Sequence, residues 1–492
     1  MSLNQEVHQL LRKIGPGYMI TTAYDTAWIA RLGEFGEPIG EKALMWLREN
    51  QLPDGSWGAT QPYYHHDRVV CTLAAVNALA RRGRVQDRKR LRKAEEALEK
   101  ATKGLKKDPA GETIGFELIV PTLIHEAKAL GAIHRHEDEV LKKLAPKRAA
   151  KLSALPKGMV NRSVTVAFSS EMAGHDGRNL LDVENLQETN GSVGHSPSAT
   201  SYFALYVCHQ NPAALDYLNR VAPEGKAPNV APFDVFEPAW VLWNLMLIET
   251  LETEILALFG PHLDFLESTW TPGKGIAHAA EYTPKDGDDT SLVYEVLTRA
   301  GRTVDLDAVQ SYEHVYYYRC FDLESNPSIS ANIHVLGALR HGGLDKQHPS
   351  VQKVVNFLNG VITEDAFWYD KWHASPYYAT TQAIIACAGY TDELAYNAIP
   401  WLLETQNQDG SWGYYSPTAE ETAYCLQALI IWRRQGHSVP DETLKRGVAW
   451  LQEHKDPPYP PLWIGKCLYC PELVVQSAIL SALMMAAQDQ NL

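Results

Sequence analysis

The sequence has little of what nucleic-acid binding, export or membrane insertion requires. Acidic residues outnumber basic ones, 59 against 45, and the formal net charge is -14 without a long basic block, which argues against a nucleic-acid partner. The most apolar segment, residues 473–487, is shorter than the ~20 residues that span a bilayer, so we expect no integral membrane segment. Residues 1–15 are polar and charged, unlike a signal peptide, and we therefore expect a cytoplasmic location.

Cysteine is scarce and irregularly placed, which excludes a disulfide framework. The chain has 7 cysteines, an odd number scattered over 492 residues, and we expect most of them to be buried thiols. Cys467 and Cys470 form a lone C-x-x-C pair with no second pair at zinc-finger spacing. The sequence therefore does not predict a structural zinc or redox site there.

The chain does contain a dense acidic motif. Asp286, Asp288 and Asp289 fall within four residues, directly before the apolar residues 292–297. Like-charge repulsion and apolar surroundings raise the pKa of at least one of these carboxyls, so that it can remain a neutral acid at pH 7 and donate a proton. The alternative is a helix N-cap, which an aspartate at this place would also provide. A calcium loop fits poorly, because its glycine and distal glutamate are not at the required offsets.

A short pattern recurs three times and indicates a helical repeat protein. Each copy is a glutamine, three residues, a glycine, a serine and an apolar residue between two helical runs; the copies begin at Gln51, Gln187 and Gln406. Repeated helix pairs predict stacked or ring-closed helical hairpins, and the spacing favours two barrels over one open solenoid. Turn-rich breaks at residues 33–40 and 223–228 predict the domain boundaries.

The second half of the chain is rich in aromatic residues, among them Trp270 and Trp372. Many of these rings pack helices together. An aromatic pocket beside an acid is also what carbocation chemistry requires, because ring faces stabilise cations without offering a nucleophile. Together, the acidic motif and the aromatic residues favour a catalytic role for this motif over helix capping alone.

Several motifs carry a resemblance to a known family. Asp286-Gly-Asp-Asp-Thr-Ser291 resembles the D-x-D-D motif of class II terpene cyclases, and Thr22-Ala-Tyr-Asp-Thr-Ala-Trp-Ile-Ala30 resembles the near-N-terminal signature of class II diterpene cyclases. The glutamine-glycine-serine loops are similar to the QW repeats of that superfamily. Residues 185–193 and 329–338 look most like the bacterial halimadienyl (tuberculosinyl) diphosphate synthases, with kolavenyl and copalyl diphosphate synthases nearby.

The resemblance implies a reaction and leaves alternatives open. It implies protonation-initiated cyclisation of geranylgeranyl diphosphate to a bicyclic diterpenyl diphosphate of halimadienyl, kolavenyl or copalyl type. The diphosphate is retained, because Asp288 and Asp289 are followed by Thr, Ser and Leu and no D-D-x-x-D segment of class I enzymes exists. The alternatives are a sesquiterpene cyclase acting on farnesyl diphosphate, a squalene-hopene-type triterpene cyclase, and a non-catalytic helical-repeat binding module.

The family also implies the fold and the role of each acidic residue. It implies an all-α protein of two α-α barrels, with residues 1–36 and 225–492 in the beta-type barrel that carries the acid and residues 37–224 in an inserted gamma-type barrel. Asp288 is then the general acid, which Asp286 and Asp289 tune and orient. His334 occupies the place of an Asn or His that bonds the acid, although a hydrogen-bonded core histidine is the alternative.

The resemblance further implies groups that bind the substrate. Lys151 and Lys371 fall where relatives hold the diphosphate, and Lys466 is a weaker third candidate. Asn229 matches the asparagine of a copalyl-type base dyad, but Phe168 or Ser169 occupies the place of its histidine partner. Methyl and hydride shifts before deprotonation are therefore expected.

Magnesium dependence is implied too, although the acidic magnesium segment of the family departs here. Residues 107–112 lack its paired acidic form, so Asp108 and Glu112 are weak candidate ligands for Mg²⁺. The expected partners are the isoprenoid diphosphate substrate, a downstream diphosphate-processing enzyme and a second copy in a homodimer.

Overall fold

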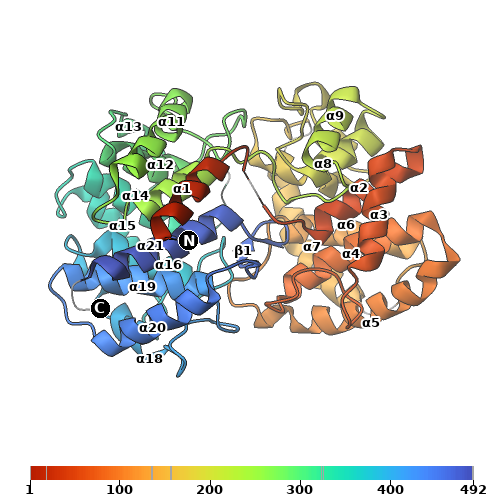
Figure 1. Cartoon of the computed structure of the whole chain (residues 1–492). Helices are drawn as coiled ribbons and strands as arrows, with labels where there is room; N and C mark the ends of the chain where they lie inside the picture. Colours follow the sequence, from red (N-terminus) through yellow and green to blue (C-terminus); the bar gives the residue numbers. More distant parts are fainter. Residues whose placement is uncertain are drawn as a thin grey trace.

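The computed structural model describes residues 2–17, 19–134, 137–155, 158–322, 324 and 326–489, without the side chains of residues 137 and 138. Over these residues the regular secondary structure is helical, apart from isolated β-bridges and one small β-hairpin in which Trp463 pairs with Tyr469. The prediction of an all-α fold is confirmed. Figure 1 shows two helical lobes that meet along one side, with β1 at their junction.

The C-terminal lobe contains the first helix and everything after residue 235. Its elements are α1 (Leu3–Lys13), α10 (Phe236–Leu245), α11 (Thr253–Thr269), α12 (Gly287–Arg299), α13 (Asp307–Gln310), α14 (Ile329–His341), α15 (Pro349–Val361), α16 (Pro376–Cys387), α17 (Asp392–Ala395), α18 (Ala398–Glu404), α19 (Ala419–Arg434), α20 (Asp441–His454), β1 (Trp463–Ile464), β2 (Leu468–Tyr469) and α21 (Glu472–Gln488). Helices α10, α12, α14, α16, α19 and α21 contact one another in sequence around a shared core.

The N-terminal lobe is shorter and contains more 3-10 helix. Its α-helices are α2 (Ala23–Arg31), α3 (Pro38–Glu49), α4 (His65–Arg82), α5 (Arg88–Gly104), α6 (Phe116–Ala129), α7 (Glu137–Ser153), α8 (Pro197–Tyr202) and α9 (Pro212–Val221). Its other helical segments are η1 (Leu32–Phe35), η2 (Val85–Asp87), η3 (Leu105–Lys107), η4 (Thr165–Ala173), η5 (Arg178–Leu180), η6 (Val183–Asn185) and the π-helix η7 (Phe203–Val207). A second hydrophobic core lies inside this lobe.

The two cores show where the chain crosses between the lobes. Helix α2 is buried on every side and packs against α3, α4 and α8, so it lies inside the N-terminal lobe. A helix without a polar face needs neighbours all round, and the N-terminal lobe supplies them. The first crossing therefore lies between α1 and α2, which differs from the predicted boundary after residue 36. The second lies between Ala227 and Val235, close to the predicted residue 225.

The glutamine loops stabilise the helical hairpins. Gln51 donates to the carbonyls of Gly55 and Arg90 at 2.8 and 3.0 Å, and Trp57 donates to the carbonyl of Leu47 at 2.8 Å. The loop glycine has φ 92°, a left-handed conformation that glycine adopts without strain. Gln187 and Gln406 make the matching bonds to Gly191 and Gly410 in their own loops. These contacts agree with a structural role for the repeats.

Candidate active site

The acidic motif begins α12, and each aspartate makes different contacts. Asp286 is the N-cap, and its Oδ1 accepts the backbone N–H groups of Asp288 and Asp289 at 3.0 and 2.8 Å. These bonds satisfy two of the unpaired donors that every helix start presents. Capping is thus the work of Asp286, which leaves the side chain of Asp288 free to contact another element.

That other element is α14, which brings His334 to the acid. His334 Nδ1 lies 2.5 Å from Asp288 Oδ1, and the two side chains are 3% and 16% exposed. The ring of Trp240 meets the imidazole edge to face at 5.6 Å. Asp288 lines the cavity described below, whereas His334 does not and lies behind it.

The other two carboxyls form a buried pair with raised pKa values. Burial raises the pKa of Asp289 well above its ordinary value, and the charges of Asp286 and Asp288 raise it further. Burial also raises the pKa of Asp286, but its bonds to Asp289 and to the helix start oppose that rise. We place the proton of the pair on Asp289, because the backbone donors at Asp286 favour an ionised carboxylate there.

A cavity of about 1190 Å³ lies where the two lobes meet. Both lobes line it, with Phe116, Lys151 and Phe168 from the N-terminal lobe and the three aspartates from the C-terminal lobe. The aromatic part of the wall includes Phe233, Phe236, Tyr282, Phe321, Trp372, Tyr378, Trp463 and Tyr469. The predicted joint occurrence of an acid and aromatic rings is therefore present in one cavity.

Two of the three predicted lysines line this cavity. Lys151, on α7, forms an ion pair with Glu117 of α6. Lys371 forms an ion pair with Glu324, donates to the carbonyl of Asn326 at 2.6 Å and lies over the ring of Trp372. Cations from both lobes thus face the same space as the acid.

The structure places Lys466 elsewhere. Its ammonium group is fully buried and contacts Glu171 at 2.6 Å and the hydroxyls of Ser196 and Ser198 at 2.7 Å each. These contacts use all three N–H donors of an ammonium. Lys466 does not line the cavity, so its environment differs from that of a diphosphate ligand.

Of the other residues predicted to bind the substrate, two line the cavity and one does not. Trp372 and Asn229 line the cavity, and Asn229 Nδ2 donates to buried Asp25 at 3.0 Å. Trp270 does not line it, and its indole N–H donates to Asp305 at 2.8 Å. Phe168 and Ser169, which occupy the sequence position of the histidine in a copalyl-type dyad, also line the cavity, as do His66 and His278.

Asp108 and Glu112, the weak magnesium candidates, also line the cavity. Asp108 Oδ2 accepts the backbone N–H of His66 at 2.8 Å and lies 2.7 Å from its Nδ1, while Glu112 pairs with Lys147 at 2.5 Å. Their carboxylate oxygens suit Mg²⁺ chemically. Both carboxylates are engaged by a basic residue, but the side chain of Glu112 is 29% exposed and that of Asp108 is 2% exposed, so Glu112 is the more accessible ligand.

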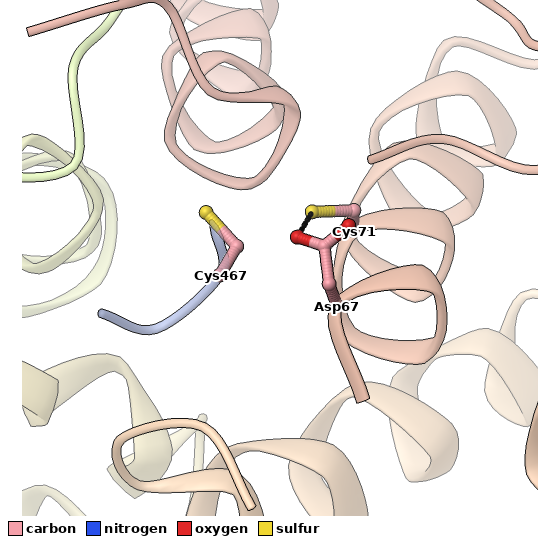
Figure 2. Close-up of side chains that lie close together, drawn as sticks. All are labelled: Asp67, Cys71 and Cys467. Atoms are coloured by element: carbon pink, nitrogen blue, oxygen red, sulfur yellow. Dashed lines mark hydrogen bonds between the residues drawn. The ribbon is translucent and has the colours of Figure 1, made fainter. Parts of the chain in front are cut away.

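A second group of ligand-type side chains lies outside the cavity. The ligand atoms of Asp67, Cys71 and Cys467 lie within 4.8 Å of one another. Figure 2 shows Asp67 and Cys71 on one helix and Cys467 on a separate segment of the C-terminal hairpin. The carboxylate of Asp67 already accepts the N–H groups of Leu468 and Ala59 at 2.9 and 2.8 Å. These bonds fasten the hairpin to α4 without a metal.

The sequence did not single out Glu420, which lies behind the aromatic wall. It is completely buried and accepts a hydrogen bond from Trp463, a lining residue. The signal was present, because Glu420 and Glu421 are consecutive acids at the start of the otherwise apolar helix α19. Acidic residues are common in the first turn of a helix, so this pair did not indicate a functional role in the sequence.

No helix within the described ranges is long and apolar enough to cross a membrane.

Comparisons with known proteins agree with this picture. Residues 312–460 match the family model of the squalene-hopene cyclase C-terminal domain. The chain is 45% identical to the type B diterpene cyclase of Mycobacterium tuberculosis, over 98% of this chain and 99% of that one. It is 31% identical to an ent-copalyl diphosphate synthase of a Streptomyces species, over 89% and 86%.

Solved structures resemble this one as well. The ent-copalyl diphosphate synthase from Streptomyces platensis superposes with a TM-score of 0.80 at 29% identity, covering 99% of both chains. Likeness over the whole length confirms the predicted α-α barrel fold.

Proposed function

Because the chain belongs to the class II diterpene cyclases, we propose that it cyclises geranylgeranyl diphosphate to a bicyclic diterpenyl diphosphate of halimadienyl, kolavenyl or copalyl type. The diphosphate remains on the product. The observation that carries the proposal is the 2.5 Å contact between His334 Nδ1 and Asp288 Oδ1 beside a cavity with aromatic walls. It combines an oriented acid with a surface that tolerates carbocations.

Asp288 is the general acid in this proposal. His334 holds Oδ1 from behind, which leaves Oδ2 to carry the proton toward the terminal alkene. The alkene π electrons form the new C–H bond, and the neighbouring carbon becomes the cation that the next double bond attacks. Asp286 fixes the start of α12, and neutral Asp289 avoids a further negative charge beside Asp288, which would make Asp288 a weaker proton donor.

The aromatic wall stabilises the positive charge as it moves. Trp372, Tyr378 and Trp463 line the cavity with aromatic rings and offer no strong nucleophile. Loss of a proton from the last cation ends the reaction as a new double bond. Phe168 or Ser169 occupies the sequence position of the copalyl-type histidine, which supports methyl and hydride shifts before that loss.

Lys151 and Lys371 hold the diphosphate. Each is paired with a glutamate in the absence of substrate, and a diphosphate offers more charge and more acceptors than one carboxylate. Mg²⁺, if bound, would be held by Glu112 together with the diphosphate, where it would neutralise negative charge. The proposal also includes a homodimer and a downstream enzyme that consumes the diphosphate product.

A product analysis tests the proposal. The purified protein is incubated with geranylgeranyl or farnesyl diphosphate, with magnesium or with EDTA, and the products are treated with phosphatase and identified by mass spectrometry and NMR. We expect a bicyclic C20 alcohol that appears only after phosphatase treatment. A C15 product would move the substrate to farnesyl diphosphate, and a hydrocarbon formed without phosphatase would contradict retention of the diphosphate.

A further inference from the structure

A buried carboxylate lies directly behind the aromatic wall of the cavity. Glu420 Oε1 accepts three hydrogen bonds, from Trp463 Nε1 at 2.8 Å, Tyr424 Oη at 3.0 Å and His373 Nε2 at 3.2 Å. The side chains of Glu420 and His373 are both 0% exposed. Three donors on one oxygen favour the ionised form of a carboxyl group.

No lysine or arginine compensates the carboxylate of Glu420. Among the described residues none has a side-chain nitrogen within 4.0 Å of it, and its one basic contact is His373 Nε2 at 3.2 Å. Nδ1 of that ring lies 3.1 Å from the backbone N–H of Ser375 and 3.2 Å from the carbonyl oxygen of the same residue. Glu420 Oε2 is buried and has no hydrogen-bond partner among these residues. A buried carboxylate oxygen without a partner is costly unless it has a use.

Trp463 connects this charge to the cavity. It lines the cavity, and its ring lies 4.9 Å from that of Tyr378 and 5.6 Å from that of Phe236. Phe236 stacks on Trp240 at 3.9 Å, and Trp240 in turn contacts His334. The anion therefore lies behind a continuous row of rings that begins at the acid.

We propose that Glu420 acts through Trp463 to make the aromatic wall bind a carbocation more strongly than it binds the neutral substrate. An anion bonded to the indole N–H increases the electron density of the ring face, and in a site without water its own field also reaches the cavity. Fixed charge of this kind lowers the energy of a cationic transition state without reorganising during the reaction. Glu420 is a positioning residue, and the inference rests on the proposed function.

The chain offers a matched control in the next residue. Glu421 is equally buried, but it accepts bonds from Ser375 Oγ, Thr418 Oγ1 and the backbone N–H of Tyr414, at 2.5 to 2.8 Å. None of these three donors belongs to a residue that lines the cavity. Glu420→Gln and Glu421→Gln therefore each replace a carboxyl group by an amide in the same helix turn. Only Glu420 lies directly behind the aromatic wall of the cavity.

The test measures the affinity of each protein by calorimetry for two analogues of geranylgeranyl diphosphate. One carries an ammonium nitrogen where the cation forms, and the other carries carbon at that place. We expect Glu420→Gln to lose about tenfold affinity for the ammonium analogue relative to the carbon one, and a similar factor in kcat with an unchanged KM. In Glu421→Gln the ratio should not change. An unchanged ratio in Glu420→Gln would overturn the inference.

A second pair of variants covers the case in which Glu420→Gln does not fold. Trp372 also lines the cavity, but its indole N–H donates to the neutral hydroxyl of Ser328 at 3.0 Å. Trp463→Phe should lose more preference for the ammonium analogue than Trp372→Phe, and an equal or smaller loss would overturn the inference. If the wild type binds neither analogue and forms no product, the proposed function fails instead.

Discussion

The three neighbouring carboxyls of the acidic motif have different roles. Asp286 caps α12 with two backbone bonds, Asp289 is buried beside it, and Asp288 reaches His334 and the cavity. A helix cap and a catalytic acid are usually alternative interpretations of such a motif. Here the cap holds the acid in place, because the same bonds that start the helix fix the backbone of Asp288.

His334 should orient the acid and leave the product unchanged. We expect His334→Ala to slow cyclisation by about 10²-fold or more, since positioning a catalytic acid contributes on that order. His334→Asn should recover part of the rate, because an amide can also bond a carboxyl group. Single-turnover rates with product analysis measure both. A changed product mixture at a nearly normal rate would instead make His334 part of the cavity wall or a terminal base.

Asp289 makes stability depend on pH. Its folded pKa is raised above the unfolded value, so the folded state keeps a proton that the unfolded state releases, and stability falls as pH rises above about 4 toward the folded pKa. Asp289→Asn mimics the neutral acid and can still donate to Asp286. It should gain stability over the wild type by about 1.4 kcal/mol for each pH unit in that window. Urea unfolding at pH 5, 6 and 7 measures the difference; a constant difference would contradict the assignment of the proton.

Among the helical elements, a fourth glutamine-type loop lies hidden in the chain. Trp368 Nε1 donates to the carbonyl of Leu358 at 2.9 Å, and Thr380 bonds the backbone of Trp368, as Trp57 and Thr72 do in the first loop. Its turn residue is Ala366 with φ 63°. The sequence pattern does not reveal this copy, because Ile362, Ala366 and Phe367 replace the glutamine, glycine and serine that define it.

Ala366 therefore stores strain that glycine would relieve. A left-handed conformation costs a residue with Cβ about 1–2 kcal/mol, and glycine pays roughly 0.5–1 kcal/mol in chain entropy. We expect Ala366→Gly to raise the free energy of unfolding by about 0.5–1 kcal/mol in urea titrations. Ala149→Gly, at an exposed helical position of α7, should lower it by about 1 kcal/mol. Destabilisation by both changes would show that Ala366 is unstrained.

Local patterns predicted the elements better than long-range packing. The N-cap at Asp286 and the three complete loops depend on residues within a few positions, and all of them appear as expected. The place of α2 depends on which lobe buries it. Its buried surroundings are set by residues far away in the sequence, such as Ala227, whose carbonyl accepts the N–H of Thr22.

At the scale of the whole molecule, the C-terminal hairpin joins the lobes. Lys466 lies between β1 and β2, and its ammonium contacts Glu171, Ser196 and Ser198 of the N-terminal lobe. The resemblance suggested a diphosphate ligand from the residue type alone. The packing of the two lobes decides which groups accept the three hydrogen bonds of the lysine. The motif around Lys466 does not contain this information. Trp270, by contrast, donates to Asp305 within its own lobe and does not line the cavity, although it was predicted to contact the substrate.

Lys466 and Lys371 should therefore respond differently to substitution. Lys466→Met leaves Glu171 buried and unpaired, and we expect it to destabilise the protein by about 3–5 kcal/mol. Lys371→Ala should destabilise the protein less, because the side chain of Lys371 is 27% exposed and that of Lys466 is 0% exposed, and it should weaken diphosphate binding by roughly 1.5–3 kcal/mol. Thermal unfolding and KM measured on both variants compare them. If Lys371→Ala lost stability and kept its KM, the diphosphate site would lie elsewhere.

The central claim is that Asp288 starts the reaction by protonating the substrate, and one experiment in heavy water tests it directly. The wild type and Asp288→Asn are incubated with geranylgeranyl diphosphate in D₂O, and the products are examined by mass spectrometry after phosphatase treatment. We predict one deuterium in each wild-type product molecule, at the ring carbon that was the terminal alkene CH, and no product from folded Asp288→Asn. A cyclised product without deuterium, or normal turnover by Asp288→Asn, would contradict the account.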